Sequence, residues 1–126
     1  MKRSLLVMLL MLISCSKSDS DIFAEARLAE SENNIQLQYE NYNVIVNDFP
    51  KSEFHAESLF RMGYICANDL KKYDEAKTLF NSFLSTYPKH ELKMAAEFEI
   101  KNMGVPIEEL SIFNKIKSDS TSVKNR

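Results

Sequence analysis

The chain is poor in the residues on which β-rich and disulfide-stapled folds depend. Its 126 residues include two glycines, three prolines, two cysteines and no tryptophan. Hairpins and sandwiches use glycine and proline at their turns, so this shortage argues against them and favours helices. The length is enough for one domain.

Basic charge is not in excess either. From residue 15 onward the chain has 14 basic and 18 acidic side chains, so no basic surface is expected to attract nucleic acid. The sequence contains no G-x-S-x-G, phosphate-loop or H-E-x-x-H motif. His55 and His90 lack a Cys or His at metal-ligand spacing, which favours surface or capping roles for both. We therefore expect a non-enzymatic protein without a metal, a cofactor or a small-molecule substrate.

The first 15 residues have the pattern of an export signal. Two basic residues, Lys2 and Arg3, precede nine apolar residues at positions 5–13. Nine residues are too few to span about 30 Å of hydrocarbon as a helix, which takes about 20 residues. They do match the apolar core of a signal peptide. The segment ends with the sequence LISC at residues 12–15, which resembles the bacterial lipobox.

This resemblance implies that the thiol of Cys15 receives a diacylglycerol and that residues 1–14 are removed as a signal peptide. The acyl chains would anchor the protein, since each buried methylene adds about 0.8 kcal/mol of membrane affinity. The alternative is a simple signal peptide with a chance cysteine at its end. With Cys15 lipidated, Cys66 is the remaining thiol, and we expect it to have a packing role. A redox or intermolecular role for Cys66 is the alternative.

Residues 15–21 are expected to form the lipidated cysteine and a flexible polar tether. The sequence SKSDSD at residues 16–21 has no apolar side chain. Ser16 stands where an aspartate would favour the inner membrane of Gram-negative bacteria, so it favours the outer membrane, facing the periplasm. The acidic stretch leaves exposure at the cell surface as the alternative.

The rest of the chain contains an internal repeat of 38 residues. The segments FPK at residues 49–51 and YPK at residues 87–89 lie at this offset. Self-similarity at a period of 20 to 50 residues predicts a solenoid of stacked units. The same offset relates seven further pairs: Tyr42 and Phe80, Asn43 and Asn81, Ile45 and Phe83, Val46 and Leu84, Glu53 and Glu91, Phe54 and Leu92, and Phe60 and Phe98.

The apolar residues inside each unit recur at steps of three and four, which predicts helices. We expect helices over residues 35–49, 54–68, 73–87 and 92–103. Pro50 and Pro88 disfavour the α region for the residue before them, so a helix should end close to each proline. Ser52 is suited to cap the helix that follows it.

The unit from Ala56 to Pro88 resembles a tetratricopeptide repeat. Leu59, Phe83 and an inter-helix turn one residue longer depart from the motif. The preceding unit is weaker, with matches at Ala26, Tyr42 and Pro50, and the third unit has one helix. The residues that carry the resemblance in the best copy are Gly63 and Ala76 at the small positions, Tyr73 at the start of the second helix, Phe80 one turn after Ala76, and the terminal Pro88.

The resemblance implies an all-α, tetratricopeptide-like solenoid of antiparallel helix pairs. It covers residues 22–104 in about two to two and a half repeats, within a domain at residues 22–117. The longer period and the aromatic-Pro-Lys ending are similar to one subgroup of the family. That subgroup includes the repeat lipoprotein of the outer-membrane β-barrel assembly machine and the periplasmic repeat protein that works with the Tol–Pal system.

A further amphipathic helix is expected after the turn at residues 104–106. Ile107, Leu110, Phe113 and Ile116 follow at steps of three. Terminal repeats need a cover for their open apolar end, which we expect this helix to supply. A partner-binding helix is the alternative. Residues 118–126 are polar and predicted to be a disordered tail.

The first helix of each pair lines the concave wall of such a solenoid. The resemblance therefore implies partner binding, to an envelope protein or peptide, by residues of the helix at 54–68. Ordinary surface roles are the alternative for each of these residues. The predicted function is a membrane-anchored interaction adaptor of the bacterial cell envelope, in outer-membrane assembly or division. The alternative is a structural subunit of a larger envelope or surface complex. The candidate binding residues are Glu57, Phe60, Arg61, Tyr64 and Asn68, with a core role as the alternative for Phe60.

Overall fold

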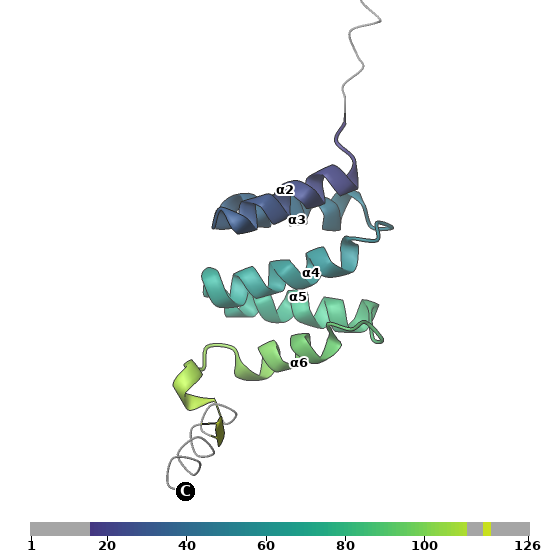
Figure 1. The fold of residues 1–126 in the computed structure, drawn as a ribbon. Coiled ribbons are helices and arrows are strands. Elements are labelled where there is room, and N and C mark those ends of the chain that lie inside the picture. Colours follow the sequence, from purple (N-terminus) through teal and green to yellow (C-terminus); the bar gives the residue numbers. More distant parts are fainter. Residues whose placement is uncertain (1–15, 111–114, 117–126) are drawn as a thin grey trace, which may run out of the picture.

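The chain folds as a stack of antiparallel helix pairs (Figure 1). The computed structural model describes residues 16–110 and 115–116, and all regular secondary structure within them is helical. Each helix packs on the next along the chain, as the predicted tetratricopeptide-like solenoid requires. The helices are α2 (Asp19–Ser31), α3 (Ile35–Asp48), α4 (His55–Tyr64), α5 (Tyr73–Thr86) and α6 (Lys93–Asn102).

The 38-residue repeat is visible in the backbone angles. Phe49 and Tyr87, which follow α3 and α5, have φ and ψ of −126° and 59° and of −125° and 59°. A proline follows each of them, and this is why both helices end there. Asn33 and Lys71, in the turns before α3 and α5, have positive φ angles of 54° and 57°. The described residues therefore contain two helix pairs of closely similar geometry, followed by α6 as a single helix.

The predicted extra residue between the helices of the second pair is not in the turn. It is absorbed by a π-helix, η2 (Ile65–Asp69), which continues α4 directly. The amide of Leu70 donates to the carbonyl of Ile65 at 3.0 Å, a bond that spans five residues instead of four. An inserted residue widens one turn of a helix in this way without ending it. Because the π-helix takes up the additional residue, the connection before α5 keeps the geometry of the connection before α3.

Helix α2 begins earlier than the sequence predicted. Residues 19–21, expected to belong to the flexible tether, form its first turn. Ser18 caps this turn: its Oγ accepts from the amide of Asp21 at 3.2 Å, and the Asp21 carboxylate accepts from the amide of Ser18 at 3.2 Å. This reciprocal capping box satisfies two amides that a helix end leaves free. Only residues 16–18 are left between α2 and Cys15.

The predicted signal peptide and Cys15 lie outside the described residues. Among the residues that the structure does describe, no helix combines the length and the apolar character needed to cross a bilayer.

The C-terminal segment also differs from the prediction. Gly104 has a φ of +77° and ends the turn after α6 beneath the ring of Tyr73. Residues 107–109 form one 3₁₀ turn, η3 (Ile107–Glu109), and Leu110 is not helical, so the predicted capping helix does not start at Ile107. Residues 115–116 are helical, with Ile116 61% exposed. The remainder of the predicted helix and tail, residues 111–114 and 117–126, lies outside the described part of the chain.

The two helices of the second pair lie in close contact at Gly63. A Cβ atom built on Gly63 would lie 2.9–3.1 Å from three atoms of the Phe80 ring. Ala76 and Phe80 are fully buried, so neither helix leaves room for the ring to move away. The missing side chain of Gly63 is therefore what lets α5 pack this closely on α4.

Aromatic rings fill the space on either side of this contact. Phe83, at a position where the repeat motif has a small residue, is fully buried and meets Phe60 edge-on, with ring centroids 5.8 Å apart. In the first pair, Gln38 replaces the small residue of the motif and is buried, and its amide donates to the carbonyl of Ala29 at 3.4 Å. The two departures therefore have local compensations, by aromatic packing in one pair and by a hydrogen bond in the other.

Replacement of Gly63 by alanine is expected to lower the free energy of unfolding by about 1 to 2 kcal/mol. Overpacking a closed core costs about 1–3 kcal/mol, and the better helix propensity of alanine offsets up to about 1 kcal/mol of it. Urea denaturation followed by circular dichroism measures the difference. Asn81→Ala, on the exposed side of α5, serves as the control that changes propensity alone. A Gly63→Ala variant as stable as the parent would show that the Phe80 ring can shift.

Candidate functional site

Helices α2, α4 and α6 lie on the same side of the stack and form a hollowed face (Figure 1). Three hollows follow one another over this face. One lies between the first turns of α4 and α6, one between the ends of α2 and α4, and one between η2 and the end of α6. This face is where the sequence predicted partner binding.

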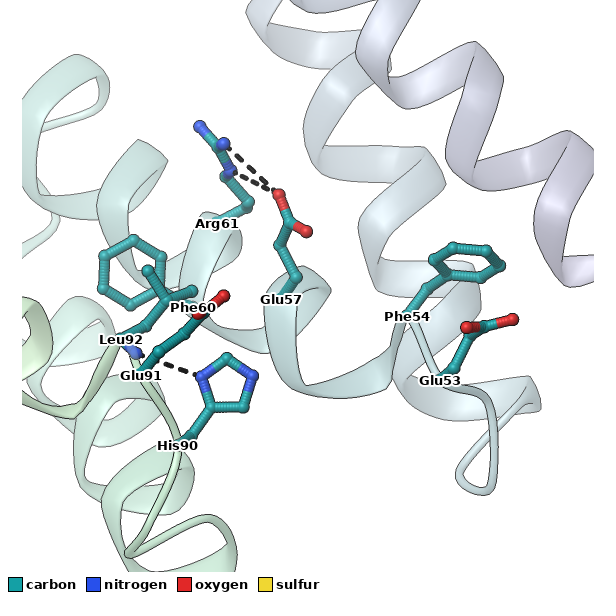
Figure 2. Close-up of a pocket in the computed structure, with 8 residues that line it drawn as sticks. All are labelled: Glu53, Phe54, Glu57, Phe60, Arg61, His90, Glu91 and Leu92. Atoms are coloured by element: carbon teal, nitrogen blue, oxygen red, sulfur yellow. Dashed lines mark hydrogen bonds and ion pairs between the residues drawn. The ribbon is translucent and has the colours of Figure 1, made fainter.

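The first hollow, called here the α4/α6 groove, has a volume of about 370 Å³. Figure 2 shows its walls. One comes from the start of α4 and the other from the turn that leads into α6. The groove is open to solvent, and its lining mixes carboxylates with aromatic and aliphatic groups. The eight lining residues are Glu53, Phe54, Glu57, Phe60, Arg61, His90, Glu91 and Leu92.

The five predicted binding residues all come from α4 and η2, but the structure distributes them over the three hollows. Glu57, Phe60 and Arg61 line the α4/α6 groove together. Tyr64, which is 42% exposed, lies in the hollow between α2 and α4, which it shares with Arg61. Asn68 lies in the third hollow, where its amide donates to the carboxylate of Glu99 at 3.0 Å.

Phe60 was predicted as a binding residue, with a core role as the alternative. Its side chain is 8% exposed and belongs to the core, and it also lines the groove. Its ring lies edge-on to Phe80 and Phe83, at centroid distances of 5.5 and 5.8 Å. Phe60 therefore forms the floor of the α4/α6 groove and is held by the packing beneath it.

Four charged side chains join α2 to α4 on this face. Arg61 lies 3.0 Å from Glu30 and 3.3 Å from Glu57, and Arg27 lies 2.7 Å from Glu30 and 3.8 Å from Glu57. The side chains are 30–46% exposed, so each ion pair contributes only about 0.2–1 kcal/mol to the stability of the fold. The alternating charges neutralise one another, and Glu57 is therefore already paired at the edge of the groove.

Both histidines lie close to the ring of Tyr87, and His90 also lines the groove. The Nδ1 atom of His90 accepts from the amide of Leu92 at 3.1 Å, which caps the turn into α6. In the neutral ring the hydrogen is then on Nε2, and this assignment follows from the hydrogen bond. The Nδ1 atom of His55 lies 2.7 Å from the hydroxyl of Tyr87. Both histidines contact the Tyr87 ring, so they help to fix the turn that forms the second wall.

Five lining residues were not predicted, and most of them come from turns. Binding residues were predicted on the helix at 54–68, whereas residues 90–92 precede α6. A signal for them was present. The 38-residue offset pairs Glu53 with Glu91 and Phe54 with Leu92, and the two members of each pair lie on opposite walls of the groove.

Cys66 lies away from this face, in the π-helix between α3 and α5. Its side chain is fully buried, and burial raises the pKa of its thiol to about 11. Nearby, the hydroxyl of Tyr39 donates to the carboxylate of Glu75 at 2.6 Å, and burial also raises the pKa of Tyr39. A protonated, enclosed thiol is a poor nucleophile, which is consistent with the predicted packing role.

No group of three or more His, Cys, Asp and Glu side chains in the described residues is arranged to hold a metal ion.

Comparison with known families identifies the second helix pair. Residues 57–90 match the family model described as Tetratricopeptide repeat, and this segment spans α4, η2, α5 and the start of the next turn. Comparison with curated proteins and with solved structures found no match. The second helix pair is thus similar to a tetratricopeptide repeat, a module that generally mediates protein–protein binding. The matched segment includes Glu57, Phe60 and Arg61 on one side of the α4/α6 groove and His90 on the other.

The buried thiol predicts a loss of stability at alkaline pH. Because the pKa of Cys66 is higher in the folded protein than its ordinary value of 9.0, its contribution is complete below pH 9 and declines as the pH rises toward 11. Urea denaturation at pH 8 and pH 10 should show a smaller alkaline decline in Cys66→Ala than in the parent chain. An equal decline in the two proteins would mean that the thiol does not ionise on unfolding.

Proposed function

We propose that this protein is a membrane-anchored adaptor that binds a segment of a partner protein on the face formed by α2, α4 and α6. The single observation that carries the binding role is the α4/α6 groove, which lies at a junction of two repeat units. It has a fixed aromatic floor and an open polar rim. A binding site of this kind needs little reordering when a partner enters, so less of the interaction free energy is lost.

The proposed anchor is a lipid on Cys15. It is supported by the basic start, the short apolar run and the LISC sequence of residues 1–15. Since α2 begins at Asp19, only residues 16–18 separate it from Cys15, and three residues span at most about 11 Å. An anchor there would hold the α2 end of the stack close to the bilayer surface and leave the α4/α6 groove further from it.

The proposed setting is the envelope of a Gram-negative bacterium. Ser16 after the cysteine favours the outer membrane, with the domain in the periplasm, and the resemblance to the assembly and Tol–Pal repeat proteins suggests a role in outer-membrane assembly or division. The partner in this proposal is an envelope protein or peptide.

Expression of the full chain in a Gram-negative host tests the anchor. We expect intact-mass spectrometry to show the loss of residues 1–14 and the addition of acyl chains, with the protein in the outer-membrane fraction. The Cys15→Ala variant should lack the acyl mass and leave that fraction, whereas Cys66→Ala, which removes the other thiol, should behave like the parent. An unlipidated protein in the soluble fraction would refute the anchor and leave the groove as the site of a soluble adaptor.

A second candidate function is favoured by the outer side of α6. Met94 and Phe98, four residues apart on this helix, are 79% and 46% exposed. Isolated exposed apolar residues are common, but here they occur on α6, the last helix that the described residues add to the stack, where a further helix would continue the solenoid. The protein would then be a structural subunit whose α6 face is covered by a neighbouring subunit in an envelope or surface complex.

The subunit hypothesis predicts self-association of the chain from residue 16 onward when it is made without lipid. Analytical ultracentrifugation at low micromolar concentration should show dimers or larger species. Met94→Lys with Phe98→Lys should shift them to monomers, and Leu28→Lys, an exposed position on α2, should not. A parent protein that remains monomeric at this concentration would argue against the subunit role.

A further inference from the structure

The two walls of the α4/α6 groove are copies of each other. Glu53 and Phe54 form one wall, and Glu91 and Leu92, 38 residues later, form the other. The backbone repeats as well, because Phe54 has φ and ψ of −84° and −6° while Leu92 has −77° and 1°. The solenoid thus presents a carboxylate next to an apolar side chain on each side of the same groove.

The two repeated carboxylates are available to a partner. Glu53 and Glu91 are exposed, and neither carboxylate has a hydrogen bond or an ion pair with any residue that the structure describes. Glu57, the third carboxylate of the groove, differs from them because Arg61 and Arg27 already bind it. The negative charge that remains uncompensated at the groove therefore comes from the two walls. Residues 16–110 as a whole have 17 acidic and 10 basic side chains, so the net charge of this part of the chain is also negative.

The apolar part of the groove is held rigidly. The ring of Phe54 stacks on that of Phe23 with centroids 4.5 Å apart, and Phe60 is fixed from below by two buried rings. Figure 2 shows the Phe60 ring and the Leu92 side chain together at one end of the groove, with His90 beside them. The Nδ1 atom of His90 is occupied by the amide of Leu92, which leaves its Nε2–H as a hydrogen-bond donor at the groove.

We propose that the α4/α6 groove binds an extended protein segment in which basic side chains flank an apolar one. The basic groups pair with Glu53 and Glu91, and the apolar side chain lies on Phe60 and Leu92. The Nε2–H of His90 donates to a carbonyl of the bound backbone. This assignment of partner chemistry rests on the proposed adaptor function. Acidic segments are rejected, because their carboxylates would face Glu53 and Glu91 without a counter-charge.

The test uses the full chain in a non-ionic detergent and three fluorescein-labelled dodecapeptides. Their sequences are four repeats of Lys-Leu-Gly, of Gln-Leu-Gly and of Glu-Leu-Gly, so they share the apolar residue and differ only in charge. Fluorescence anisotropy should show the tightest binding for the lysine peptide and none for the glutamate peptide. Binding of the lysine peptide should weaken as salt is raised, because exposed ion pairs are screened.

Variants then place the binding in the groove. Glu53→Gln and Glu91→Gln should each raise the Kd of the lysine peptide about two- to fivefold, which is the range for a partly exposed ion pair. Glu40→Gln, the same substitution at an exposed position of α3, is the matched control and should leave the Kd unchanged. These glutamates are exposed, so the substitutions preserve the fold, and circular dichroism checks this.

The outcomes separate this inference from the adaptor function on which it rests. Equal Kd values for the lysine and glutamine peptides, or no effect of Glu53→Gln and Glu91→Gln, would overturn the proposed basic specificity and leave a groove that binds by apolar contact. Loss of lysine-peptide binding in Glu40→Gln to the same extent would also overturn it, because attraction would then come from the total charge. Failure of all three peptides to bind would contradict both the specificity and the peptide-binding role of the groove.

Discussion

The contact of the Phe80 ring with the bare backbone of Gly63 is the constraint on which the rest of the stack depends. With no side chain between α4 and α5 at this point, the ring occupies the interior and Phe60 packs edge-on against it at 5.5 Å. Phe60 also contacts Phe83, whose ring lies 5.4 Å from that of His90. The floor of the α4/α6 groove and the turn that forms its second wall are therefore positioned by the same core.

Sequence patterns predicted the helix boundaries well wherever a strong local cause exists. The expected helix at 73–87 is observed at Tyr73–Thr86, and the one at 35–49 at Ile35–Asp48. In both cases a proline two residues beyond the last helical residue determines the end. The start of α2 was missed because Ser18 and Asp21 are polar in sequence, and only their mutual hydrogen bonds stabilise the first turn. A flexible polar segment and a capping box can have the same composition.

The groove was predicted only in part because its geometry depends on contacts between distant residues. The candidate binding residues of α4 included Phe60, for which a core role was the alternative, and the rings of α5 bury this side chain. Glu91 precedes the helix predicted at 92–103 and Leu92 is the first residue of that helix, so only the comparison of one repeat with the next could connect them with Glu53 and Phe54. The pairing of Arg61 with Glu30 likewise depends on how α2 lies against α4, and no local rule supplies that.

The π-helix at Ile65–Asp69 has a consequence for how such a repeat can vary in length. An inserted residue in an α-helix turns everything after it by about 100°, which would carry Ala76 and Phe80 out of phase with Gly63. A single wide turn takes up the additional residue before α5 begins, so the two halves of the unit keep their relative phase. Units whose lengths differ by one residue can therefore follow one another along one solenoid with their helices in the same relative phase.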